Sequence, residues 1–291
     1  MNKLLATTAL AGFLLASPVY ADGFYVGGET GYGWSTDAGI DHKTDYPGGE
    51  FHHLKVAPFQ YDWNSSLGSS IMGGLAVGYE YKLPATYGVV RFELGTNYRP
   101  GFSYDKMANY DSFDSKKFCY EDVCSKSLSI TASKKLMTDI SSIAVMTNAY
   151  YDAKQWGYAG NNFAIYPSVG AGLGFARNKV DDVKGQLNYA AVKQFNSPWH
   201  NSTHNYDGQQ DFNLEGDTNI SFAWQVMGGV GMDFPQGWSG SLMYRYADLG
   251  SGNTGTKLTS SGSFGSSEAT VDAIKGDLHV HEIVLGVRKT F

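Results

Sequence analysis

The sequence predicts an all-β chain that closes into a transmembrane, antiparallel, up-and-down β-barrel of eight strands. Three observations favour this fold class. Apolar and polar side chains alternate at period two in eight segments, and the connections between these segments are long and short by turns. Beyond the N-terminal leader, no apolar run reaches the length of a membrane helix. The 36 glycines, 20 tyrosines, 16 phenylalanines and 6 tryptophans suit twisted strands bordered by aromatic girdles.

The first half of the chain contains four alternating segments, at 24–34, 71–82, 89–99 and 142–153. A long polar stretch follows the first segment, the short LPATYG joins the second to the third, and another long polar stretch precedes the fourth. The apolar positions that share one face in these segments are Phe24, Val26, Tyr32, Trp34, Ile71, Leu75, Val77, Tyr79, Tyr81, Val90, Phe92, Leu94, Tyr98, Ile143, Val145 and Tyr151.

The second half repeats the pattern at 163–176, 221–234, 239–249 and 278–291. A modest turn precedes its first segment, a polar stretch rich in Asn, His and Asp precedes its second, and a tight PQGW turn leads to its third. In the C-terminal strand, Ile283, Val287 and Phe291 oppose Glu282 and Arg288. Alone, this strand fits a soluble half-buried sheet equally well.

The strict alternation of long and short connections decides between these interpretations. It is typical of outer-membrane barrels, with short periplasmic turns, long extracellular loops, an even strand number and both termini in the periplasm. A soluble sandwich has no reason to alternate its loop lengths. Ten strands, with 128–137 or 51–56 as additional strands, are the alternative within this class.

The N-terminus has the pattern of a secretory signal peptide. Lys3 precedes an apolar run from Leu4 to Leu15, and Val19 and Ala21 occupy the small-residue positions of a cleavage site. The predicted organisation is therefore a signal peptide at 1–21 and one outer-membrane β-barrel at 22–291. The formal charge of −6 speaks against a nucleic-acid partner, because phosphate binding needs clustered Lys and Arg.

The two cysteines lie close together in FCYEDVC, within a polar region. In the oxidising compartment reached after export, Cys119 and Cys124 are expected to form a small disulfide loop. A metal site is disfavoured, because no further Cys and no nearby His completes a ligand set.

If the apolar faces point to lipid, the opposite faces bring acids and bases together in one lumen. Buried charges need partners, so these residues should form an ion-pair network with Asn97, Asn148 and Gln225 that plugs the barrel. The alternative is a narrow gated conduit for small solutes. The expected lumenal charges are Glu29, Glu80, Lys82, Arg91, Glu93, Arg99, Arg245, Glu282 and Arg288.

Several stretches resemble the opacity-protein and OmpA-like outer-membrane barrels, especially the porin-family surface antigens of α-proteobacteria. These stretches are MTNAYYD, YPSVGAGLGFA, FAWQVMGGVGMDF, MYRYADLG and HEIVLGVRKTF, in that order. The resemblance implies a monomeric eight-stranded barrel in the outer membrane that serves as a surface antigen, structural protein, adhesin or small porin. It implies no enzyme chemistry and no cofactor.

In that family, the C-terminal strand is also the signal read by the barrel assembly machinery, with a glycine five residues before a terminal aromatic. Gly286 and Phe291 match this pattern, whereas Lys289 stands where an aromatic residue is usual. The expected partners are thus this machinery, outer-membrane lipid and lipopolysaccharide, and host surface molecules that contact the loops.

Histidines give three weak signals of other chemistry. His200-Asn201-Ser202 faintly resembles the His-x-Ser of outer-membrane lipid A deacylases, but it lies in a polar loop instead of a strand wall. His200 with His204, and His52 with His53, lack a defined third ligand, so solvated histidines are the preferred interpretation. His279 and His281 are expected at the loop edge of the last strand.

The polar loops also hold aromatic residues, which could contact molecules outside the cell or pack together as a loop cap. These residues are Phe59, Trp63, Tyr110, Phe113, Tyr120, Trp199 and Tyr206. The sequence therefore predicts a structural surface protein without enzyme activity, with a small porin as the alternative.

Overall fold

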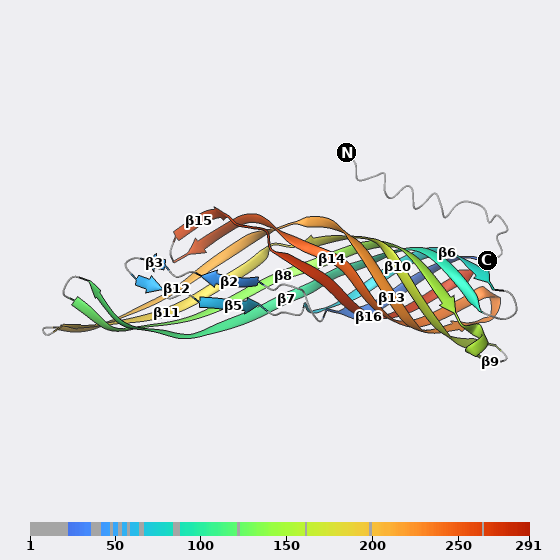
Figure 1. Ribbon diagram of the computed structural model, residues 1–291, viewed down its shortest axis with the longest axis horizontal. Helices are drawn as coiled ribbons and strands as arrows, with labels where there is room; N and C mark the ends of the chain where they lie inside the picture. The colour runs from blue at the N-terminus through green and yellow to red at the C-terminus, as the bar shows by residue number, and fades with distance from the viewer. Residues whose placement is uncertain are drawn as a thin grey trace.

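A computed structural model of the chain confirms the predicted fold class, since eight antiparallel strands close into one ring. Figure 1 shows this ring at one end of an elongated molecule and tall hairpins at the other. The signal peptide predicted at 1–21 lies outside the described residues. The structure describes residues 23–35, 42–46, 49–51, 54–56, 59–63, 67–83, 88–120, 123–160, 162–197, 200–263 and 265–291.

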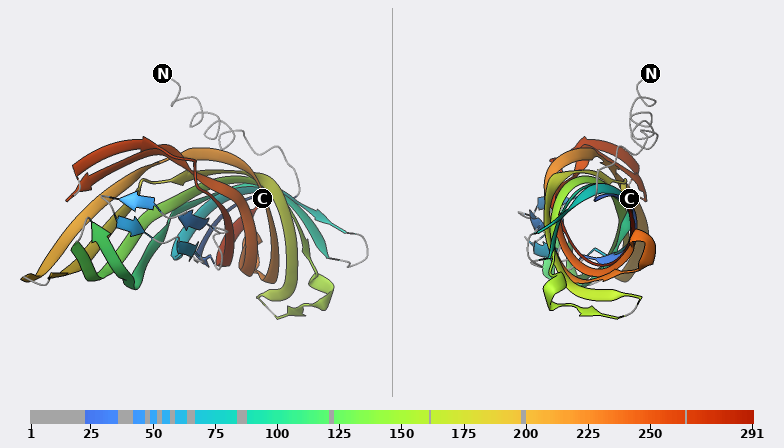
Figure 2. Two further views of the ribbon diagram at one scale, coloured as in Figure 1. Left: turned by 60° about the vertical axis from the view of Figure 1, so that its left-hand side comes forward. Right: turned by 90° about the vertical axis from the view of Figure 1, so that its right-hand side faces the viewer.

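The ring has no edge strand, because the first strand pairs with the last (Figure 2, right). Tyr25 lies opposite Thr290, and the Phe291 N–H donates to the Phe24 carbonyl at 2.9 Å. Around the ring the strands are β1 (Phe24–Trp34), β6 (Ser69–Lys82), β7 (Val89–Tyr120), β8 (Val123–Asp152), β10 (Ala164–Val180), β13 (Thr218–Asp233), β14 (Trp238–Gly262) and β16 (Lys275–Thr290).

The two ends of the ring differ. The end that carries both termini, here called the terminal end, has short connections (Figure 1). The opposite hairpin end has long ones that rise beyond the ring. The short connections contain η2 (Lys154–Trp156), β9 (Tyr158–Ala159) and η3 (Pro235–Gly237), and the long ones contain β11 (Val183–Ser197), β12 (His200–Gly216) and β15 (Gly265–Thr270).

The long polar stretches predicted as loops are largely continuations of the strands. β7 and β8 run for 32 and 30 residues, and β11 takes over from β10 as the neighbour of β8. Polar residues can form such hairpins because the strand ladder satisfies their backbone groups while both faces meet water. Figure 2 (left) shows these hairpins as a curved wall above the ring.

The ten-strand alternative is wrong for the part of the chain that the structure describes. Residues 128–137 continue β8 and add no strand to the ring. Residues 51–56 fall in a small pair, β3 (Gly49–Phe51) with β4 (Leu54–Val56), which is separate from the ring, as is β2 (His42–Tyr46) with β5 (Phe59–Trp63).

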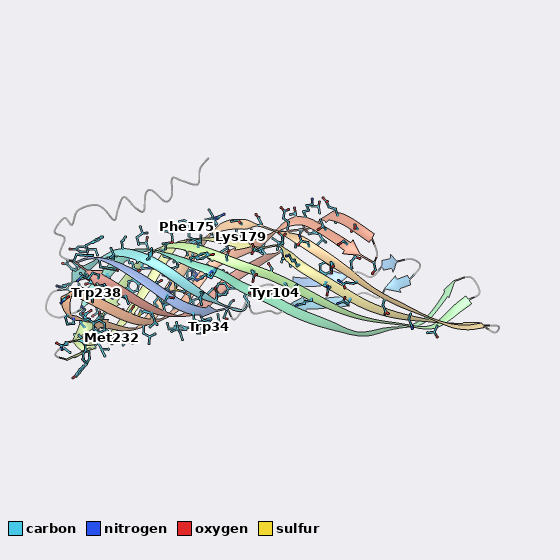
Figure 3. The ribbon with its side chains drawn as sticks, turned by 180° about the vertical axis from the view of Figure 1, so that it is seen from behind. Trp34, Tyr104, Phe175, Lys179, Met232 and Trp238 are labelled. Carbon is cyan, nitrogen blue, oxygen red and sulfur yellow. The ribbon has the colours of Figure 1, made fainter. Side chains whose placement is uncertain are left out.

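The outer wall of the ring is apolar, as the alternation predicts. Large apolar side chains project outward from every strand of the ring, and Phe175 and Trp238 mark this wall in Figure 3. Among those exposed by 40% or more are Tyr32, Ile71, Leu75, Phe92, Leu94, Ile143, Val145, Val169, Leu173, Phe175, Phe222, Leu242, Ile283, Leu285 and Val287. Such a wall is stable against lipid and unstable against water.

Glycines on the lumenal face make room for inward tyrosines, because a ring of eight strands has little interior space. A Cβ at Gly170 would lie 2.5 Å from the Tyr150 ring, and one at Gly231 would overlap the Tyr166 ring. On the outer face, a Cβ at Gly228 would meet nothing within 4 Å.

Gly231→Val should therefore destabilise the barrel by about 1–3 kcal/mol, because Tyr166 must leave its place in the lumen. The measurement is the urea midpoint of the refolded mature protein in lipid vesicles. Gly228→Val, on the outer face of the same strand, is the matched control and should leave the midpoint nearly unchanged. Equal midpoints for the two variants would contradict the packing described above.

Candidate functional site

The lumen is the most highly ordered polar region of the described chain. Near the terminal end, Asp152 is completely buried and accepts hydrogen bonds from three side chains. Arg91 donates to both of its carboxylate oxygens at 2.8 and 3.2 Å, and Ser168 Oγ donates at 2.6 Å. Arg288 Nη2 adds a longer contact of 3.5 Å. These donors replace the water that the buried carboxylate has lost.

Arg288 extends this network across the ring. Its Nε donates to Glu80 at 3.0 Å and its Nη2 donates to the Tyr166 hydroxyl at 3.0 Å. Tyr166 in turn donates to Asp233 at 2.7 Å, and Lys154 from η2 donates to the same carboxylate at 2.5 Å. The terminal-end network thus links strands from opposite sides of the barrel.

A second network lies one level toward the hairpin end. The Arg99 guanidinium donates two hydrogen bonds to the Glu282 carboxylate, from Nε at 2.6 Å and from Nη2 at 2.9 Å. Both residues are fully buried. Arg245 lies 3.5 Å from Glu282 and donates to Glu29 at 2.7 Å. With its amide oriented to satisfy both ends, Asn97 donates to Glu29 at 2.7 Å and accepts from Arg245 at 3.0 Å. These bonds offset the cost of burying the charges.

Glu93 is held mainly by neutral donors. The hydroxyls of Tyr25 and Tyr150 donate to it at 3.0 and 3.2 Å, and Asn148 donates at 3.1 Å. Gln225 then donates to Asn148 at 2.7 Å from β13, two strands away around the ring. A cavity of about 40 Å³ remains between the two networks, which is room for roughly one water molecule.

An apolar cluster of buried side chains lies on the hairpin side of Arg99 and Glu282. Its members come from seven of the eight ring strands or their adjoining residues, and each is at most 7% exposed. They are Leu67, Phe102, Tyr104, Ile140, Ala144, Met146, Ala176, Val180, Ala223, Ala247, Leu249, Leu278 and Val280. An ion crossing here would lose its hydration without gaining a partner.

The structure places eight of the nine expected lumenal charges in these networks: Glu29, Glu80, Arg91, Glu93, Arg99, Arg245, Glu282 and Arg288. The expected lumenal residue Lys82 is instead exposed at the end of β6. Sequence reasoning missed Asp152 and the apolar cluster. Asp152 could have been found, because it shares the alternation of Met146, Asn148 and Tyr150.

The other predicted sites are placed only in part. The backbone register sets Cys119 opposite Cys124 at the tip of the β7–β8 hairpin, but their side chains lie outside the described residues, so the disulfide stays a prediction. The side chains of His52, His53, His200, His204 and the loop aromatics also lie outside them. In the described part of the chain, no group of three His, Cys, Asp or Glu could hold a metal ion.

The assembly-signal residues lie on β16 and at the end of the chain. Gly286 faces the lumen, where a Cβ would lie 2.6 Å from Ser241 Oγ, and Phe291 is exposed on the outer wall. Lys289 contacts the Gln236 carbonyl of the η3 turn. Recognition of this strand by the assembly machinery stays a prediction.

Comparison with known families identifies the chain. It matches the family described as outer membrane protein beta-barrel domain over residues 5–291. The chain is a member of this outer-membrane β-barrel family. Its location in the outer membrane follows, so the terminal end faces the periplasm and the hairpin end faces the outside of the cell. No helix in the described residues is long and apolar enough to cross a membrane.

Several solved barrels are distantly similar to this outer-membrane barrel. Neisserial surface protein A is 13% identical, with a TM-score of 0.38 over 92% of this chain and 97% of that chain. Ail, the attachment invasion locus protein of Yersinia pestis, is 10% identical with a TM-score of 0.30 over 92% and 99%. The outer membrane protease OmpT from Escherichia coli is 10% identical with a TM-score of 0.30 over 95% and 99%. No curated protein matches the chain. These likenesses are too low for a functional inference.

The extracellular hairpins of the barrel carry a polar groove of about 920 Å³. Asp182, Gln186, Asp211, Ser261 and Glu268 are among the residues that line it. The Gly216 N–H and then the Asn213 amide donate to Asp182, which lowers the pKa of this carboxyl from its ordinary value. The groove lining holds three carboxylates, Asp182, Asp211 and Glu268, against one lysine, Lys184, and Lys257 pairs with Glu268 at 3.1 Å.

The buried pair of Arg99 and Glu282 should dominate lumen stability. Arg99→Met should lower the free energy of unfolding by about 3–5 kcal/mol, because it leaves Glu282 buried with only the longer Arg245 contact. Lys179→Met, which breaks an exposed pair with Asp181, is the control and should leave the free energy of unfolding nearly unchanged. Both are measured by urea unfolding in vesicles. A similar loss for the two variants would show that burial of the lumenal pair contributes little.

Proposed function

We propose that this outer-membrane barrel is a non-conducting structural and surface protein without enzyme activity. The observation that carries the proposal is the double closure of the lumen: an apolar cluster above two networks of buried ion pairs. The alternative, a small porin, would require a continuous polar path. The cavity of about 40 Å³ between the two networks is too small to supply one.

The barrel spans the outer membrane and stiffens it locally, while its extracellular hairpins present a tall polar wall. The acidic groove, with its exposed serines, carboxylates and amides, has the composition of a surface that contacts polar molecules. The family resemblance to surface antigens and adhesins supports contact with host molecules.

The experiment that tests the closed lumen is ion conductance of the refolded mature protein in a planar bilayer, after heat-modifiable gel migration has verified folding. No steady conductance is expected. Arg91→Ala should lower the melting temperature, because Asp152 loses its main partner. This variant should still show no ion conductance, because the apolar cluster is unchanged. A general porin in the same bilayer is the positive control. Saturable conductance of the wild type would overturn the proposal in favour of the porin.

The surface role is tested by shortening one hairpin without disturbing the barrel. Asn188 pairs directly with Gln209, so an Asn-Gly turn can replace residues 189–208 and keep the register. Folding should be unaffected, whereas binding of cells that display the barrel to cultured host cells should fall severalfold. Trp156→Ala, at the periplasmic end, is the control and should not alter binding. Unchanged binding by the shortened barrel would contradict a contact role for this hairpin.

A further inference from the structure

The two histidines of the last strand lie within the strand and on the outer wall, not at a loop edge. His279 and His281 alternate with the lumenal Val280 and Glu282 along β16, so both project away from the ring. Neither takes part in the lumenal networks described above. A histidine on the membrane-facing wall of a barrel therefore calls for a separate explanation.

His281 is enclosed by aromatic side chains from both neighbouring strands. The Trp34 ring stacks on it at 6.0 Å with an interplanar angle of 16°, and the Tyr246 ring meets it edge-on at 5.1 Å. Its Nδ1 and the Tyr244 hydroxyl are 2.5 Å apart. The imidazole is thus fixed in orientation, with rings on either side.

A second row lies one step toward the extracellular end. His279 stacks on Tyr246 at 6.2 Å, and its Nε2 is 3.6 Å from Asp248. The Trp224 indole donates to the same carboxylate oxygen at 3.1 Å, and the Gly250 N–H donates to the other at 2.8 Å. The two rows form a patch of seven residues, here called the outer-wall cluster: Trp34, Trp224, Tyr244, Tyr246, Asp248, His279 and His281.

The outer-wall cluster lies at the edge of the apolar band. On β16, the outward residues Ile283, Leu285 and Val287 lie on its periplasmic side and are 50–57% exposed. On its extracellular side the outward positions are Asp277 and Lys275. Figure 3 shows Trp34 far from the periplasmic residues Met232 and Trp238, toward the hairpins. On β13 the exposed Phe222 and Ile220 continue the apolar wall beyond Trp224, so the cluster borders acyl chains on that side and reaches the headgroup level of the outer leaflet along β16.

An aromatic girdle accounts for tryptophan and tyrosine at this depth, but not for a carboxylate held between an indole and an imidazole. We propose that the outer-wall cluster binds the sugar ring of a glycolipid in the outer leaflet. Aromatic rings pack against the C–H faces of a sugar, a carboxylate accepts bonds from its hydroxyls, and an imidazole can donate or accept. The cluster contains no Arg or Lys and one carboxylate, which disfavours a phosphate as the main determinant.

The inference needs only the outer-membrane location and is independent of whether the lumen conducts. It is tested by native mass spectrometry of the mature barrel released from nanodiscs that contain phosphatidylcholine with one probe lipid. The probes are lipid A, which carries sugar and phosphate, a monogalactosyl diacylglycerol, which carries sugar alone, and phosphatidylglycerol, which carries phosphate alone. The wild type should retain both sugar lipids about tenfold more than phosphatidylglycerol.

Two variants probe the cluster and one controls for the loss of an outward aromatic residue. Asp248→Asn and Trp34→Leu should each lower retention of both sugar lipids severalfold. Tyr98→Leu, which removes an exposed ring from β7 elsewhere on the wall, should leave it unchanged. Heat-modifiable migration verifies that each variant is folded. The proposal is overturned if phosphatidylglycerol is retained equally well, if only lipid A is retained, or if the folded cluster variants behave like the control.

Discussion

The constraint on which this structure depends is the narrowness of an eight-stranded ring. Closing the sheet removes its edges and satisfies every backbone group that lipid would leave unpaired, but it leaves an interior that side chains just fill. Each inward position must then be very small, or large and matched to a partner across the lumen. Gly231 is an example of the first kind, because it leaves room for the Tyr166 ring. Arg99 is an example of the second, because it pairs with Glu282.

The interior is divided by chemistry along its axis. Toward the periplasm, Asp152 and Arg288 bond to polar groups from several strands, and Lys154 and Asp233 stand at the open edge where water can reach them. Toward the outside, Phe102 and Leu278 pack as in the core of a soluble protein. The second network lies between these two regions, and its buried side chains pair with one another instead of with water. This division supports the proposal of a structural barrel that does not conduct ions.

The sequence predicted those features that depend on local alternation, and it failed where distance along the chain matters. Period two identified the outward wall and the eight lumenal charges, because each residue's face follows from its own strand. It could not pair Arg99 with Glu282, which lie 183 positions apart, since that pairing depends on register around the ring. The polar composition of the long connections predicts loops, because it does not distinguish a hairpin exposed to water from irregular chain. The apolar cluster was missed because Leu278 and Val280 interrupt the charged face of their strand.

The distribution of partners over the last strand has a consequence for how the barrel is made. Glu282 and Arg288 on β16 bond to groups on β6, β7, β10 and β14, so the lumenal networks span the seam between the first strand and the last. Before β16 docks, Arg99 and Glu80 face an open sheet and must keep their hydration. Docking of this one strand exchanges that water for protein partners in several places at once. Ring closure and completion of the lumenal networks are therefore coupled, since without β16 neither Arg99 nor Glu80 has the ion-pair partner that it has in the folded barrel.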